Sequence, residues 1–172
     1  MREDVINKMF PYCLLAQEFQ NVMANDINVI IKHVKELLRS RLEEKQINLQ
    51  LQCDEPYVFL YCDENQLTQV FLNLIINAIQ HIDRQGSIVI YIQRVNDFIE
   101  IKICDDGPGV SDNKKQKVFD PFYTQRKEGI GLGLTVVEQT VLAHSGHIFI
   151  TDNSPKGACF HVQLPIENQD QK

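Results

Sequence analysis

The sequence predicts a two-layer α/β sandwich, in which helices pack against a single sheet. The first observation is the order of hydrophobic periods along the chain: helix, two strands, helix, two strands, a long loop, helix, two strands. The second is that strands come in adjacent pairs, which is typical of hairpins and unlike the regular alternation of doubly wound sheets or TIM barrels. The third is that 172 residues, 44% of them hydrophobic, suit one domain with one core.

The first predicted elements are a helix and two short strands. Residues 1–25 show no clear period, and Asp26 is then a suitable N-cap for a helix that extends to about Lys45. Alternating apolar and polar residues predict a strand over 47–52 with one buried face. A second, shorter strand is expected over 57–61.

The clearest helix of the chain follows and leads into a hairpin. Asp63 and Gln66 form a capping-box-like start for a helix over 63–82, where apolar residues recur at steps of three and four. Two strands over 87–95 and 98–104 are then expected to pair through a short turn.

The last third of the sequence contains a long irregular segment, a helix and two strands. Residues 105–133 lack periodicity, and a stretch of this length inside a compact domain is usually functional. A helix over about 132–145 ends at Gly146, a suitable C-cap residue. Strands over 147–151 and 158–164 complete the predicted order.

Composition and charge exclude several classes of protein. The chain has 17 Lys and Arg against 23 Asp and Glu, and its net charge of −6 argues against binding nucleic acid or an anionic membrane. No apolar stretch approaches the roughly 20 residues that span a bilayer, and the N-terminus lacks a signal-peptide layout. We therefore expect a cytoplasmic chain with no membrane insertion of its own.

The cysteines show no metal-binding or redox spacing. There are five of them and no C-x-x-C pair, so free thiols in a reducing compartment are expected. The five positions are Cys13, Cys53, Cys62, Cys104 and Cys159.

Two asparagines lie on the polar side of the helix over 63–82. Asn73 and Asn77 are one turn apart and project side by side, opposite the aliphatic arc. A solvated amide-rich face explains either residue alone, but asparagine is a mediocre helix former and two of them stand in mid-helix here. Neutral oxygen ligands suit Mg²⁺ together with water and substrate phosphates, so the pair is a candidate metal site.

Two glycine-rich segments are candidates for close approach to a ligand. Asp105-Asp106-Gly107-Pro108-Gly109 follows a strand, and it fits either a plain turn or a carboxylate that accepts a hydrogen bond from a base amino group. Gly129-Ile130-Gly131-Leu132-Gly133 opens a helix, where backbone N–H groups suit phosphate, although a flexible hinge fits equally well. Neither spacing is that of a Rossmann or P-loop motif.

The loop between these segments combines aromatic and basic residues. Phe119 and Phe122 bracket Pro121 and need a core or a partner for burial. Five of the seventeen basic residues fall within fourteen positions, which fits a solvated loop or a local supply of cations for a phosphate chain. They are Lys114, Lys115, Lys117, Arg126 and Lys127.

Taken in this order, the four features resemble the ATP-binding catalytic domain of sensor histidine kinases, a branch of the GHKL ATPase superfamily. The resemblance covers Asp26 to Pro165 and implies a Bergerat-type fold, a mixed β-sheet with three helices on one face. It also implies ATP and Mg²⁺ as ligands. Ile79-Gln80 after the asparagines points towards the nitrogen-regulation-type subgroup.

The resemblance assigns roles to the polar residues of the first two motifs. By likeness to the family's asparagine box, Asn77 would hold Mg²⁺ and Asn73 would lie beside it near the phosphates, the two forming the catalytic pair. Asp105 matches the carboxylate that contacts the adenine amino group, with Gly107 and Gly109 next to it.

The remaining motifs imply a mobile lid and a phosphate-binding turn. Phe119 and Phe122 would anchor an ATP lid over 111–128, and Arg126 is the expected phosphate contact within it. The second glycine box would lie against the phosphates through Gly129, Gly131, Leu132 and Gly133.

The chain departs from the family pattern at three points. Ala158 stands where the family usually has a threonine, which removes a hydroxyl, and Gln80 replaces a common lysine. None of the five histidines lies in the acceptor motif, in which an acidic residue follows the histidine.

These observations predict half of a two-part enzyme. Residues 1–25 would be a linker or the tail of a missing dimerisation helix, 26–166 the catalytic domain and 167–172 a tail. The domain would transfer the ATP γ-phosphate to a histidine of that dimerisation domain, for relay to a response regulator. A full-length protein with a membrane anchor elsewhere fits equally. The alternatives are a non-catalytic nucleotide-binding or scaffold module, and a GHKL serine kinase or ATPase outside two-component signalling.

Overall fold

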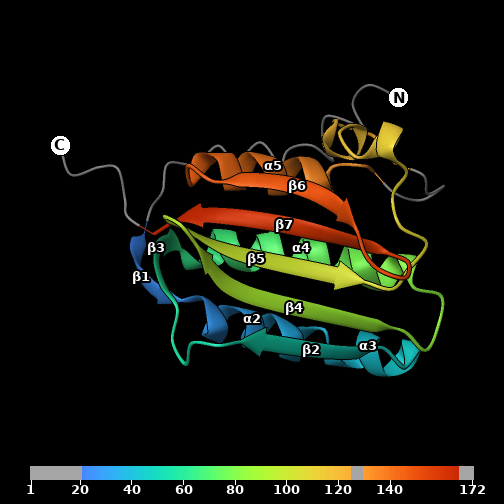
Figure 1. Cartoon of the computed structure of the whole chain (residues 1–172), viewed down its shortest axis with the longest axis horizontal. Helices are drawn as coiled ribbons and strands as arrows, with labels where there is room; N and C mark the ends of the chain where they lie inside the picture. Colours follow the sequence, from blue (N-terminus) through green and yellow to red (C-terminus); the bar gives the residue numbers. More distant parts are fainter. Residues whose placement is uncertain (1–20, 125–129, 167–172) are drawn as a thin grey trace.

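A five-stranded mixed sheet forms one layer of the molecule (Figure 1). The computed structural model describes residues 21–124 and 130–166. The strand order is β2-β4-β5-β7-β6, and only the β2–β4 pair is parallel. The strands are Asn48–Cys53 (β2), Ser87–Val95 (β4), Phe98–Asp105 (β5), His147–Asp152 (β6) and Ala158–Pro165 (β7). The predicted hairpins β4–β5 and β6–β7 are confirmed.

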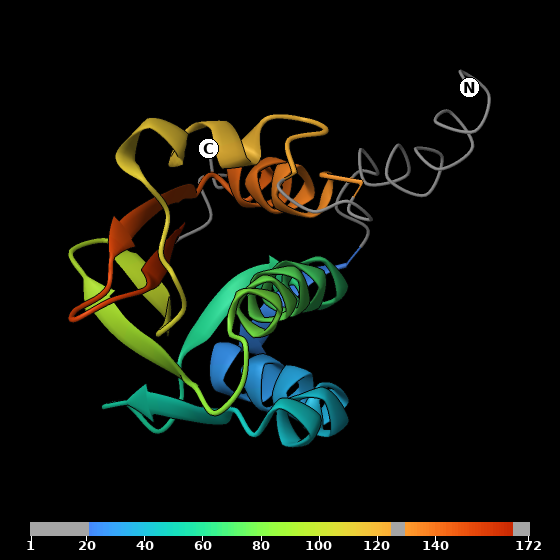
Figure 2. The same ribbon diagram turned by 90° about the vertical axis from the view of Figure 1, so that its right-hand side faces the viewer.

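The helices form the second layer and cover one face of this sheet (Figure 2). Ile99, Ile101 and Ile103 alternate along β5 and enter the core, as do the apolar residues of the helices. Phe71, from the middle of α4, is fully buried between the layers. The helices are α2 (Ile27–Leu37), α3 (Arg39–Lys45), α4 (Glu64–His81) and α5 (Gly133–Ala143). The predicted α/β sandwich with helices on one face is therefore confirmed.

A second, two-stranded sheet departs from the prediction. Strand β3 (Phe59–Asp63) pairs antiparallel with β1 (Val22–Asp26), and not with β2. The expected strand over 57–61 is thus shifted by two residues, and part of the region assigned to a linker, 22–25, belongs to a strand. Asp26 explains the arrangement, because its Oδ1 accepts hydrogen bonds from the N–H of Asn28 at 3.0 Å and from that of Val58 at 3.1 Å.

The first predicted helix bends at Leu38 and is divided into α2 and α3. The Leu38 N–H is shared between the carbonyls of Val34 and Lys35, at 3.1 and 3.2 Å. The N–H of Leu42 still donates to the Leu38 carbonyl at 3.0 Å, so the helix changes direction without ending. Gln46, in the left-handed conformation, ends α3 close to the predicted position.

A disulfide joins Cys104 to Cys159, so the expectation of free thiols is wrong for these two residues. The β5–β7 register places them directly opposite each other, with a Cα–Cα distance of 4.0 Å. Fifty-five residues separate them in sequence, and only the register of two strands brings them together. Cys53 and Cys62 carry free thiols, and burial raises the pKa of Cys62 to about 11. Cys13 lies outside the described residues.

No helix in the described ranges is long and apolar enough to cross a membrane.

Candidate functional site

A pocket of about 820 Å³ opens between α4, the loop after β5 and the segment that leads into α5. This volume suits a drug-sized organic ligand. The pocket brings together residues of all four predicted motifs, although these are far apart in sequence. Five of the predicted site residues line it: Asn73, Asn77, Gly109, Gly131 and Gly133.

Helix α4 fixes the position of Asn73. The helix starts as predicted, because Asp63 accepts the N–H of Gln66 at 3.1 Å. Ten residues into the helix, the amide oxygen of Asn73 accepts from Gln69 Nε2 at 2.9 Å, and its Nδ2 faces the Gly133 carbonyl at 3.4 Å. Asn73 therefore connects α4 to the first residue of α5 across the pocket.

Asn77 lies one turn further along α4 and is differently placed. Its side chain is half-buried in the pocket wall and makes no hydrogen bond within the described residues. Its backbone carbonyl faces His81 Nδ1 at 2.8 Å. No group of three or more His, Cys, Asp or Glu in the described part of the chain could hold a metal. A hard cation here would take the Asn77 oxygen and complete its coordination with water and ligand phosphates, the mode that Mg²⁺ prefers.

Asp105, at the end of β5, is buried beside the pocket and is not one of the residues that line it. The residue is 4% exposed, and its Oδ1 accepts the N–H of Gly107 at 2.9 Å and that of Ala158 at 3.4 Å. Burial raises the pKa of Asp105, and the two N–H donors and the charge of His81 offset part of that effect. The other carboxylate oxygen makes no hydrogen bond within the described residues, so it remains available to a ligand.

The neighbouring carboxylate, that of Asp106, has a structural role. Asp106 Oδ2 accepts from the backbone N–H of Ser87 at 2.9 Å and from its hydroxyl at 3.1 Å, which ties the loop to the start of β4. Each of the two adjacent aspartates thus keeps one carboxylate oxygen without a hydrogen bond in the described structure, but only Asp105 is buried beside the pocket. The sequence singled out the same residue.

The glycines before α5 have different surroundings. Gly131 has a φ of +73°, and a Cβ there would lie 2.6 Å from the Phe122 carbonyl carbon. Its carbonyl also accepts the Phe122 N–H at 2.9 Å, so Gly131 holds the Phe122 backbone. A Cβ on Gly133 would meet nothing within 4 Å, which leaves the start of α5 open to the pocket. Leu132 is buried, and Gly129 lies outside the described residues.

The two phenylalanines of the loop differ in burial. Phe119 is 7% exposed, packs edge-on against Phe160 at 6.4 Å, and its carbonyl accepts the Thr135 hydroxyl at 2.9 Å. Phe122 is 47% exposed and has a φ of +66°. The core therefore holds the loop through Phe119, and Phe122 is connected by its backbone.

The basic cluster is less available to a ligand than its sequence indicates. Lys115 forms ion pairs with Asp112 at 2.6 Å and with Asp152 at 2.8 Å, which attaches the loop to the end of β6. Neither Lys114 nor Lys117 lines the pocket. Arg126 and Lys127 lie outside the described residues. The expectation that Lys115 supplies charge to a phosphate chain is not supported, because two carboxylates already take up its ammonium group.

The geometry agrees with comparisons to known proteins. A family profile described as "Histidine kinase-, DNA gyrase B-, and HSP90-like ATPase" matches residues 62–168, more than half of the chain. The chain belongs to this ATPase family. It is 32% identical over 145 residues to the sensor histidine kinase ZraS of Escherichia coli K12, a match that covers 84% of this chain and 31% of that kinase. This ATPase domain thus spans about a third of the curated relative.

Solved structures show the same fold. The nucleotide-free catalytic domain of histidine kinase ThkA aligns with a TM-score of 0.80 at 25% identity, covering 86% of this chain and 97% of that one. ThkA in complex with the response regulator protein TrrA aligns with a TM-score of 0.78 at 21% identity, covering 98% of this chain and 48% of that one. The chain therefore corresponds to the ATP-binding catalytic domain of sensor histidine kinases. Its nitrogen-regulation-type subgroup stays a prediction.

Several residues of this ATPase domain's site were not found from the sequence. Phe160 lines the pocket, and the turn between β6 and β7 contacts Asp105 through a hydrogen bond from Asn153 and the close approach of Gly157. The close approach of Gly157 to Asp105 depends on the β5–β7 pairing, which joins residues far apart in sequence. Asn153 carries no signal in the sequence.

Proposed function

We propose that this domain binds Mg·ATP in the pocket and directs the γ-phosphate to a histidine of a separate dimerisation domain. The observation that carries the proposal is the convergence of α4, the loop after β5 and the start of α5 on one pocket. The polar groups of that pocket match the parts of a nucleotide.

Adenine recognition falls to Asp105. Its Oδ1 is held by the N–H groups of Gly107 and Ala158, and the second oxygen is left to accept the adenine amino group. Guanine presents a carbonyl oxygen at the same place, which a carboxylate repels. The loss of a hydroxyl at Ala158 does not remove this support, because the backbone N–H of that residue makes the contact.

The two asparagines and the start of α5 would bind the phosphates and the metal. Asn77 would be the protein ligand of Mg²⁺, which supplies charge neutralisation on the phosphate oxygens. Asn73 bridges to Gly133 and sets the distance between α4 and the open start of α5, whose N–H groups suit phosphate. We keep Arg126 as a phosphate contact, and Phe119 and Phe122 as the anchor of an ATP lid.

Transfer would need little covalent chemistry from this chain. A nitrogen of the acceptor imidazole would attack the γ-phosphorus as the bond to the ADP oxygen breaks and ADP leaves. Mg²⁺ held at Asn77 would supply charge neutralisation, and the N–H groups at the start of α5 would bind the phosphates. None of the chain's own histidines lies in an acceptor motif, so a dimerisation domain supplies the acceptor. A response regulator as the next partner is supported by ThkA, which was solved with one. We place the domain in the cytoplasm, where ATP is found.

The proposal is tested by calorimetric titration with Mg·ATP and Mg·GTP. We expect ATP to bind and GTP to bind at least about tenfold more weakly, since a mismatched hydrogen-bonding group costs this much or more. D105N should remove the preference, whereas D106N, the matched control, should keep it because Asp106 faces Ser87.

Catalysis is tested separately. γ-labelled ATP is added to the full-length kinase that contains this domain, and acid-labile label on histidine is expected. ATP binding without label transfer would contradict the kinase assignment and favour a nucleotide-binding module.

A further inference from the structure

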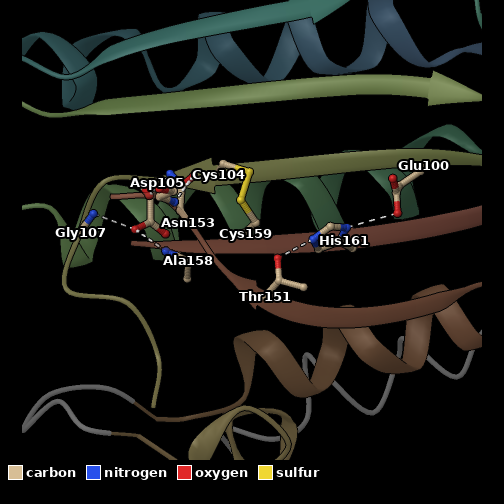
Figure 3. The surroundings of a disulfide bond; sticks show 10 residues. Glu100, Cys104, Asp105, Gly107, Thr151, Asn153, Ala158, Cys159 and His161 are labelled. Carbon is tan, nitrogen blue, oxygen red and sulfur yellow. Dashed lines mark hydrogen bonds and ion pairs between the residues drawn. A yellow bond between two sulfur atoms is a disulfide. The ribbon is translucent and has the colours of Figure 1, made fainter. Parts of the chain in front are cut away.

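The turn between β6 and β7 and the first residue of β7 both contact Asp105 (Figure 3). Asn153 Nδ2 donates to the Asp105 carbonyl oxygen at 2.8 Å, and the Ala158 N–H donates to the carboxylate at 3.4 Å. Gly157, with a φ of +111°, lies so close that a Cβ there would overlap the Asp105 carbonyl oxygen. The position of the proposed adenine contact therefore depends on how closely β7 approaches β5 at this end.

The disulfide closes the two strands at the same point. Cys104 directly precedes Asp105, and Cys159 directly follows Ala158, so the covalent bond lies one residue from each partner of the Ala158–Asp105 hydrogen bond. Figure 3 shows the two sulfur atoms between the strands, next to the Asp105 contacts. Cys104 follows the core residue Ile103 on β5, and successive side chains of a strand point to opposite faces of the sheet. The disulfide therefore lies on the sheet face opposite the helices.

Apart from the disulfide, only a weak contact from β7 reaches the carboxylate of Asp105 in the described structure. The carboxylate contact of Ala158 is 3.4 Å long, near the limit of a hydrogen bond, and Asn153 reaches the backbone of Asp105 and not its carboxylate. The cross-link restricts the separation of β5 and β7 more strongly than either contact does.

We propose that the Cys104–Cys159 disulfide positions Asp105 for adenine, so that nucleotide affinity and base selectivity depend on whether the disulfide is formed. The inference rests on the proposed adenine contact of Asp105. Both cysteines are positioning residues, because they act through Asp105 and do not touch the ligand themselves.

The redox step is a thiol–disulfide exchange. A dithiol reductant attacks one sulfur as a thiolate and forms a mixed disulfide, and its second thiol then displaces the protein. Two electrons and two protons pass to Cys104 and Cys159, and the reductant becomes a cyclic disulfide. A low-molecular-weight disulfide such as oxidised glutathione reverses the reaction and is released as two thiols.

The experiment compares the two redox states of one protein. The variant C13S/C53S/C62A keeps only the proposed pair, and it is oxidised with oxidised glutathione or reduced with dithiothreitol. Mass spectrometry after alkylation counts free thiols, and calorimetry measures the dissociation constants for Mg·ATP and Mg·GTP. We expect reduction to weaken ATP binding by about fivefold and to lower the ATP-over-GTP ratio, since couplings of 5-fold or more are typical between linked events.

Base selectivity separates positioning from general stability. A purely structural disulfide would lower the melting temperature on reduction but leave the ATP-over-GTP ratio of the folded protein unchanged. Should the reduced protein unfold at the titration temperature, C104V/C159V gives a folded comparison without the cross-link, because valine pairs suit neighbouring strands.

The outcomes distinguish this inference from the proposed function. If neither redox state binds ATP, the proposed function fails and this inference with it. If both states bind ATP with the same affinity and selectivity, the function stands and the inference is overturned. Failure to form the disulfide with oxidised glutathione also overturns it.

Discussion

The side-chain amide of Asn153 donates a hydrogen bond of 2.8 Å to the backbone carbonyl oxygen of Asp105, 48 residues earlier in the chain. Asn153 also accepts the N–H of Ser154 and donates its own N–H to the Gly157 carbonyl. The turn between β6 and β7 is therefore folded around the end of β5, where the proposed adenine contact lies.

Replacing Asn153 should weaken nucleotide binding without affecting the pocket lining. N153A removes the side-chain hydrogen bonds to Asp105 and from Ser154. A neutral hydrogen bond is worth about 1 kcal/mol, so loss of the one to Asp105 should weaken ATP binding by about fivefold if the turn controls Asp105. K156A changes an exposed residue of the same turn and should have no effect. Calorimetry decides, and equal affinity in both variants would show that the turn does not position Asp105.

Replacing Asp105 should cost binding but not stability. Burial raises the pKa of Asp105, so the ionised carboxylate lowers the stability of the folded protein. This loss of stability is absent at pH values below the ordinary aspartate pKa and is complete above the raised pKa. At neutral pH, D105N should therefore melt at the same temperature as the wild type or higher. Glu100 is a buried carboxylate for which the opposite effect on stability is expected.

Glu100 is also buried, and burial opposes its ionisation, but hydrogen bonds from Gln163, Gln93 and His161 lower its pKa overall. Its stabilising contribution is present above the ordinary glutamate pKa and is lost as the pH falls through the lowered one. E100Q should lower the melting temperature at neutral pH. A lower melting temperature for D105N than for E100Q would contradict this account of the two carboxylates.

His144 should make the domain less stable in mild acid. Its Nε2 accepts the N–H of Asp63 at 3.3 Å, and its Nδ1 faces the Thr140 carbonyl at 2.8 Å, which suits the neutral ring. Burial lowers its pKa, so the unfolded chain binds the proton more readily, and stability falls as the pH drops below about 6.5. H144Q should reduce this slope in melts from pH 7.5 to 5.5, and H147Q, at an exposed position, should not.

The sequence predicted those features of the fold that depend on interactions between residues close together in the chain. Asp63 capped α4 as predicted, because a cap involves residues three positions apart, and the helix period then placed Asn73 and Asn77 on one face. The partner of β3 was missed because strand pairing depends on residues far apart in the sequence. The disulfide was missed for the same reason, since it follows from the β5–β7 register.

The basic loop shows a second limit. Its charge cluster indicated a phosphate contact, but the structure directs Lys115 to Asp112 and to Asp152, the latter 37 residues away in sequence on β6. Charge counts do not show which cations are already paired. The likeness to a family located the motifs, and the geometry decided which of their residues face the pocket.

Lys115 should accordingly be dispensable for nucleotide binding. K115A removes two ion pairs at the protein surface, and these contribute little to stability in general. We expect unchanged ATP affinity by calorimetry, whereas R126A should weaken binding if Arg126 contacts phosphate. A marked loss of affinity in K115A would restore this lysine as a phosphate contact.

Magnesium dependence should reside in Asn77. Within the described residues its side chain makes no hydrogen bond, so N77A removes an oxygen from the pocket without breaking a contact of the fold. We expect N77A to keep the wild-type melting temperature and to bind ATP equally with Mg²⁺ and with EDTA, because the cation has lost its protein ligand. N77D keeps an oxygen at the same place and should retain the dependence on Mg²⁺. Wild-type binding that is indifferent to EDTA would remove the metal from the site altogether, and Asn77 would then be a polar residue of the pocket wall.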